Sequence, residues 1–104
     1  MNPVIKNKNN YKNPILSIED KVGNYVMLYV VHKKGESSPD HTHQWEHQAY
    51  ITKGEGVLVC NGQEYPIKEG DCILVPANQR HQFINTGEKN LERVTVNPRN
   101  SVEN

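Results

Sequence analysis

Short runs rich in Val, Ile and Tyr recur along the chain between clusters of Gly, Pro, Asn and Asp. Helical periodicity is almost absent, and this alternation is typical of an all-β sandwich or barrel. Asn61-Gly62 supplies the positive-φ pair that a two-residue type I′ hairpin needs. The pattern predicts eight to ten short strands, the clearest of them at 25–33, 48–53, 56–60, 63–67, 71–75, 81–85 and 91–96.

The chain length indicates a single domain, because 104 residues are enough for one compact core. The residues before Pro14 and after Pro98 are mostly polar and lack a strand pattern. We therefore expect a flexible N-terminal segment at 1–13, a barrel domain at 14–98 and a flexible C-terminal tail at 99–104.

The charge balance narrows the expected partners. Twelve basic residues offset twelve acidic ones, so no net field attracts nucleic acid or an anionic membrane surface, and neither is expected. No apolar run is long enough to span a bilayer, and the polar first residues do not match a signal peptide, so a cytoplasmic location is expected. Small size and exposed sheet edges favour a homodimer.

Histidines form the clearest chemical pattern. His41, His43 and His47 share one parity, and in an extended strand residues two apart point to the same face. A single H-x-H pair often occurs by chance in a sequence that binds no metal. Here, however, His81 on a separate β-type run offers a fourth, non-local imidazole. Imidazole binds Zn, Cu, Fe, Ni and Mn, so the four side chains predict a divalent transition-metal site.

Two spaced patterns carry a family resemblance. Residues that resemble the first cupin motif are Gly35, His41, His43 and Gly54. Residues that resemble the second are Gly70, Pro76, Asn78, His81 and Asn85. Asn78 replaces the usual glycine, and Asn tolerates positive φ better than most residues. The resemblance implies a double-stranded β-helix, the jelly-roll barrel of cupins.

The first motif usually carries a glutamate ligand where this chain has His47 and Gln48. The stretch H-x-H-x-W-E-H resembles instead the four-histidine subgroup, which includes a small manganese-binding cupin of a hyperthermophilic bacterium. That resemblance implies manganese as the metal, with Fe, Zn, Ni or Cu as alternatives. Gln48 is the rival ligand, but turning it inward would expose Ala49 and Ile51, so parity favours His47.

Candidate pocket residues surround this site. Phe83 shares the parity of His81 and is expected beside the metal, although core packing explains it equally well. Ile51, Met27 and Trp45 are further candidates for the wall of a substrate pocket. His32, which precedes two lysines, is expected at the surface.

The expected partner is a small-molecule ligand or substrate, and three functions of the protein are considered. The resemblance implies a metal-dependent oxygenase or related oxidoreductase that uses Mn or Fe. A non-redox lyase or isomerase of a sugar acid or another small carbohydrate is the second, with the ion as a Lewis acid. A non-catalytic binding module is the third. Metal binding should weaken below about pH 6, because a protonated imidazole cannot bind a metal.

Overall fold

The computed structural model describes residues 2–102. Each of the seven clearest predicted runs is a strand, with ends that differ by one or two residues. The elements are the 3-10 helix η1 (Ile18–Asp20), β1 (Tyr25–His32), β2 (His47–Lys53), β3 (Glu55–Cys60), β4 (Gln63–Lys68), β5 (Cys72–Val75), β6 (His81–Ile84), β7 (Leu91–Pro98) and the 3-10 helix η2 (Arg99–Ser101).

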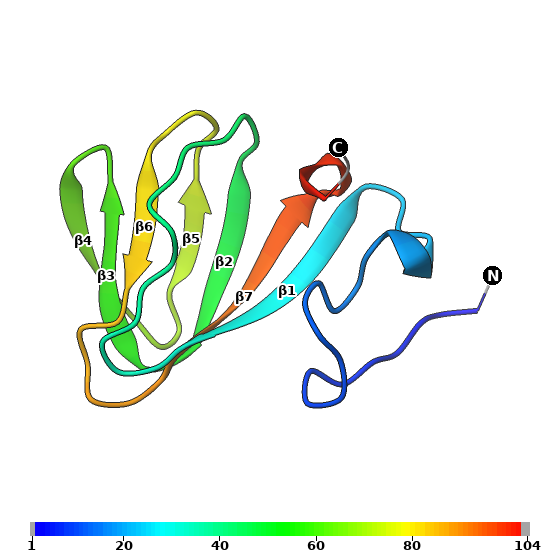
Figure 1. The fold of residues 1–104 in the computed structure, drawn as a ribbon, viewed down its shortest axis with the longest axis horizontal. Helices are drawn as coiled ribbons and strands as arrows, with labels where there is room; N and C mark the ends of the chain where they lie inside the picture. Colours follow the sequence, from blue (N-terminus) through cyan, green and yellow to red (C-terminus); the bar gives the residue numbers. More distant parts are fainter. Residues whose placement is uncertain (1, 103–104) are drawn as a thin grey trace.

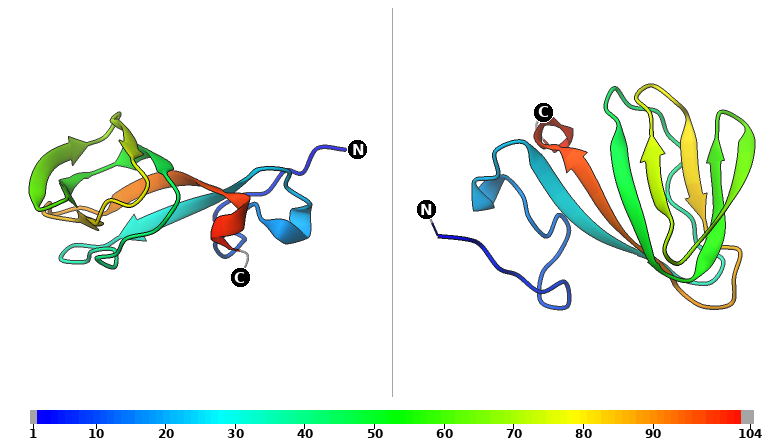
Figure 2. Two further views of the ribbon diagram at one scale, coloured as in Figure 1. Left: turned by 90° about the horizontal axis from the view of Figure 1, so that it is seen from above. Right: turned by 180° about the vertical axis from the view of Figure 1, so that it is seen from behind.

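The strands form two antiparallel sheets (Figure 1). One sheet has the order β1-β7-β2-β5 and the other the order β4-β3-β6. Seen from above, the strands curve round a common interior without closing it (Figure 2). Inward-facing side chains fill this interior, and the buried hydrophobic cluster consists of Ala49, Ile51, Leu58, Ile67, Val75, Phe83 and Leu91. The all-β jelly-roll class is therefore confirmed, in an open form.

The described residues contain fewer strands than the eight to ten expected, because the segment 33–46 runs beside β6 without forming a regular strand. Isolated bridges join Ser37 to Ile84 and His41 to His81. Pro39 lies between these bridges and has no N–H to donate, so a continuous ladder cannot form there. Residues 37–41 of this segment are nevertheless tied to β6 at both ends.

Two tight turns take the conformations that their residues predict. Asn61 and Gly62 have φ angles of 50° and 80° and join β3 to β4, as a type I′ hairpin requires. Asn78 has a φ of 64° in the turn before β6. The asparagine therefore accepts the backbone conformation of the glycine that it replaces in the second motif.

The surface of the four-stranded sheet that faces away from the interior carries several exposed apolar side chains. They are Met27, Val31, Tyr50 and Leu74.

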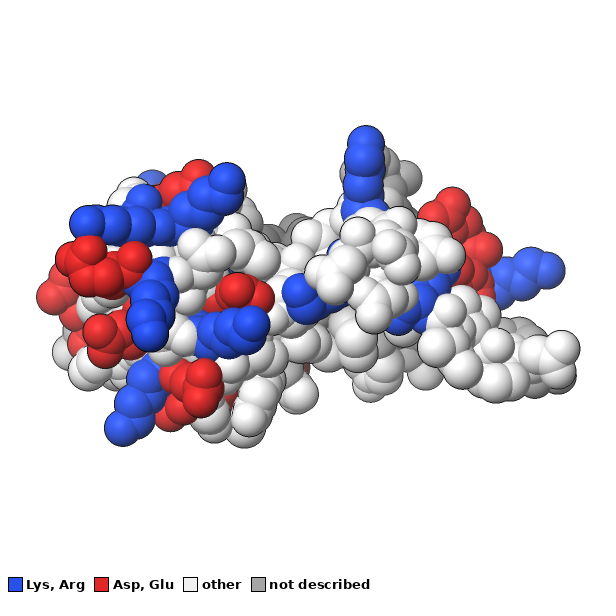
Figure 3. Space-filling view, turned by 90° about the horizontal axis from the view of Figure 1, so that it is seen from below, with Lys and Arg blue, Asp and Glu red and all other residues white. Residues whose placement is uncertain are grey.

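Lys, Arg, Asp and Glu are intermixed on the face seen from below (Figure 3). No helix among residues 2–102 is long and apolar enough to cross a membrane. The expected homodimer stays a prediction.

Gly56 in β3 allows close contact with the end of β6 and the start of β7. A Cβ atom at this position would collide with the carbonyl oxygen of Ile84 and press on the side chain of Leu91. We expect Gly56→Ala to lower the free energy of unfolding by about 2 kcal/mol or more. Gly23→Ala, whose Cβ would meet nothing within 4 Å, is the control and should change it by less than about 0.5 kcal/mol. Equal losses in urea denaturation would contradict the prediction.

Candidate metal centre

Four imidazoles from three parts of the chain meet between the two sheets. His41 and His43 come from the segment 33–46, His47 begins β2 and His81 begins β6. The backbones of His41 and His81 exchange two hydrogen bonds, of 3.2 and 3.0 Å. The backbone N–H of Asn78 donates to the carbonyl of His43 over 2.8 Å, so the turn before β6 also fixes the segment 33–46.

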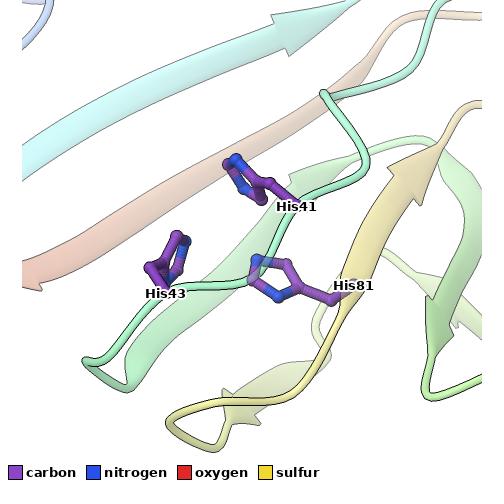
Figure 4. A group of neighbouring side chains, drawn as sticks. All are labelled: His41, His43 and His81. Atoms are coloured by element: carbon purple, nitrogen blue, oxygen red, sulfur yellow. The ribbon is translucent and has the colours of Figure 1, made fainter.

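The side chains of His41, His43 and His81 point toward one another (Figure 4). Each offers a ring nitrogen, and these atoms all lie within 4.8 Å of one another. His47 completes the histidine cluster, because its Nε2 lies 2.9 Å from Nε2 of His81 and its ring centroid lies 4.7 Å from that of His43. The strand parity that predicted the grouping explains only part of it, since His41 and His43 lie outside the regular strands.

The donor set suits a divalent transition metal. Two imidazole nitrogens bound at about 2.1 Å and at right angles on one ion are about 3 Å apart. The Nε2 atoms of His47 and His81 are separated by 2.9 Å. The histidine cluster and the fold therefore indicate a site for a divalent metal ion.

Backbone carbonyls orient two of the rings. Nδ1 of His81 lies 2.8 Å from the carbonyl oxygen of Gln79, and Nδ1 of His43 lies 3.4 Å from that of Trp45. A proton on Nδ1 donates to the carbonyl and leaves the lone pair on Nε2. In His81 this lone pair faces the other imidazoles.

Burial favours the neutral, metal-binding form of three of these rings. Burial, together with the smaller effect of the positive charges of His81, His43 and Arg93, lowers the pKa of His47 to about 3. Burial is also the main cause that lowers the pKa of His41 and of His43. Competition by protons should therefore begin at a lower pH than the value near 6 expected for ordinary imidazoles.

The histidine cluster opens into a cavity of about 490 Å³, here called the inner cavity. Phe83 and Trp45, two of the predicted pocket residues, line it. Trp45 stacks on the ring of His43 with a centroid distance of 4.4 Å, and Phe83 is almost completely buried below His81 on β6. No Asp or Glu among the described residues lines the cavity.

The other candidates lie elsewhere. Ile51 is fully buried in the hydrophobic cluster, and Met27 is 40% exposed, and neither lines the inner cavity, so both pocket assignments are corrected. Gln48 is exposed on the opposite face of β2 from His47, in agreement with the parity argument. His32 is buried rather than at the surface, because it contacts Arg93 inside the fold.

Residues from β7 complete the wall of the cavity and were not predicted. Arg93, Thr95 and Asn97 line it, followed by Ser101 of η2 in the part expected to be a tail. The sequence does hold a signal for them, because alternate positions of β7 carry these three polar residues. Valines occupy the positions between them, and in the structure it is the polar side that faces inward.

Two facing sheets with a histidine cluster between them define a protein of the cupin type. The profile of the cupin domain family matches residues 27–97, which is more than half of the chain and includes the four histidines of the cluster. The chain therefore belongs to the cupin family, and the family resemblance of its motifs is confirmed.

The proteins that resemble this chain have names that describe different functions. The chain is 40% identical to the oxalate-binding protein of Thermotoga maritima over 63 residues, which cover 60% of this chain and 52% of that protein. The polyketide cyclase RemF from Streptomyces resistomycificus has a TM-score of 0.75 at 24% identity, with 82% of this chain and 61% of that chain covered, which shows the fold alone. A cupin sugar phosphate isomerase from Silicibacter pomeroyi has a TM-score of 0.70 at 27% identity, with 77% of this chain and 54% of that chain covered. The chain spans about half the length of the curated relatives it matches.

Proposed function

We propose that the histidine cluster holds a divalent transition-metal ion and that the protein is a metal-dependent oxygenase or related oxidoreductase acting on a small organic molecule. Manganese is the proposed metal and iron the main alternative. The ion would supply Lewis acidity and a change of oxidation state. The chain supplies the four imidazoles, the inner cavity and the groups that orient the ligand.

One observation carries this proposal: four imidazoles gather at the wall of a cavity that no acidic side chain among residues 2–102 lines. A divalent ion bound only by imidazoles keeps its full formal charge. Its remaining coordination positions then favour an anionic or enolate-like oxygen of a ligand. The similarity to an oxalate-binding protein supports a small organic acid as that ligand.

A lyase or isomerase that uses the ion only as a Lewis acid is the second candidate. It is supported by the similarity to a cupin sugar phosphate isomerase. Such an enzyme needs no change in oxidation state, so a redox-inert ion would suffice. This difference separates the two proposals experimentally.

Metal analysis of protein purified without added metal, combined with electron paramagnetic resonance, tests the proposal. We expect manganese or iron at about one ion per chain, with a spectrum that changes on addition of peroxide because the oxidation state changes. Zinc alone would contradict the oxidoreductase and favour the Lewis-acid enzyme. A protein that holds no transition metal would overturn both.

A further inference from the structure

Arg93 is a buried cation without a counter-charge. Its side chain belongs to β7, faces the inner cavity and is only 6% exposed. None of the ion pairs among residues 2–102 includes it. Burial lowers the pKa of Arg93 to about 10, so the guanidinium still carries its charge at neutral pH. A buried charge with no partner is strongly unfavourable, so this residue requires an explanation.

The contacts of the guanidinium are all with neutral groups. Nη1 donates to Oγ1 of Thr95 over 2.6 Å, and Nε and Nη2 lie 3.4 and 3.3 Å from Nε2 of His32. The ring of Phe83 lies 4.0 Å from Cζ. A guanidinium has five N–H groups, and these hydrogen bonds use three of them. One N–H on each Nη therefore remains for a ligand.

The strand register places this guanidinium on the same side of the sheet as the histidine cluster. Gln48 of β2 pairs with Val96 of β7, so His47 is level with Asn97. Arg93 lies four residues before Asn97 on the same face, and its hydrogen bond to Thr95 directs the side chain toward the cluster. Its charge contributes to lowering the pKa of both His41 and His47, as expected for a cation in the same cavity.

Three further polar atoms in the wall of the inner cavity have no hydrogen-bond partner. They are Nε1 of Trp45, Oδ1 of Asn97 and Oγ of Ser101, and all three are buried. Buried polar groups are nearly always paired in folded proteins, so each of these atoms indicates a polar molecule in the cavity. They are independent of the charge of Arg93 and indicate that the same cavity takes a polar ligand with both donor and acceptor groups.

We propose that Arg93 is the anchor for a carboxylate group of the ligand, and that the other polar end of this ligand faces the histidine cluster. This inference rests on the proposed metal centre, since it names the class of molecule that the site takes: small carboxylic acids with a second oxygen donor. A carboxylate is planar and accepts two parallel N–H bonds from a guanidinium. It also compensates the charge that neither the imidazoles nor the cavity wall can neutralise.

Calorimetric titration of metal-loaded protein with glycolate, malonate and succinate tests this assignment, with glycolamide as the neutral counterpart of glycolate. We expect at least one of the acids to bind and glycolamide to bind at least about tenfold more weakly. Arg93→Met should weaken binding of that acid by about tenfold or more and leave the metal content unchanged. Arg80→Met is the matched control, because Arg80 is exposed and pairs with Asp40 outside the cavity, and it should bind the acid like the wild type.

Arg93→Lys covers the case in which Arg93→Met does not fold, because it keeps the charge and loses the planar fork. It should bind the acid more weakly than the wild type. Equal affinity of the wild type and a folded Arg93 variant, or the absence of binding by all three acids, would overturn the assignment. Absence of metal from the wild type would instead overturn the proposed function. In that case the acids are titrated into metal-free protein, where weaker binding to Arg93→Met supports the anchor and equal binding overturns it.

Discussion

Replacing His47 by alanine is expected to lower the affinity for a divalent transition metal by about 100-fold or more. Loss of a group that only supports a ligand costs about 10- to 100-fold, and loss of a ligand should cost at least as much. The Nε2 atom of His47 lies 2.9 Å from that of His81, so its removal leaves three donors. Competition with a chelator of known affinity measures the change.

Gln48→Ala is the matched control for this experiment. The side chain of Gln48 is exposed on the other face of β2, so its removal should leave the metal affinity unchanged. The pair also tests the rival ligand directly. A loss in Gln48→Ala with no loss in His47→Ala would make the amide the third ligand and would require a shift of the strand register.

The metal-free protein is expected to lose stability as the pH falls from 6.5 to 4.5. The pKa of His47 is about 3 in the folded state against 6.5 for an ordinary histidine, so the unfolded chain binds a proton in this range that the folded chain does not. The stabilisation is therefore fully present above pH 6.5 and is lost as the pH falls toward 3. His47 alone should contribute a slope of about 1.4 kcal/mol per pH unit.

His47→Gln isolates this contribution, because glutamine has a similar polarity and does not titrate. Urea denaturation in the presence of a chelator, at pH 6.5, 5.5 and 4.5, gives the free energy of unfolding for both proteins. The wild type should fall more steeply than the variant by the slope given above. Parallel curves would show that His47 titrates in the same way in the folded and the unfolded chain.

The strands could be predicted well because their residues follow a simple rule. Apolar runs are separated by turn residues, and Asn61-Gly62 and Asn78 have the φ angles that such turns require. The segment 33–46 could not be predicted, because its position depends on backbone hydrogen bonds to β6 rather than on its own pattern. His41 and His43 still meet His81, since the bridge between His41 and His81 fixes them locally.

The histidines were predictable from spacing, whereas the rest of the site was not. Periodicity assigns valines to the interior and charged residues to solvent, but β7 reverses this rule: Arg93 and Thr95 are buried, and Val94 is more exposed than either. The positions of Met27 and Ile51 relative to the inner cavity could not be predicted from the sequence. Strand parity gives the face of a residue only when another residue of the same strand has a known orientation, and it does not show how far along the strand the cavity extends. Only the opposite sheet, with Phe83 against Arg93, decides which face is inside.

The histidine cluster is divided between an irregular segment and paired strands, and this division affects how such a site can evolve. Half of it, His41 and His43, belongs to a segment outside the sheets, and the other half belongs to strands. Irregular segments accept insertions and substitutions more readily than paired strands do. Changes in the segment 33–46 can therefore alter half of the donor set while the register that holds His47 and His81 is kept. For directed evolution, libraries confined to this segment would explore new ligand preferences on an unchanged barrel.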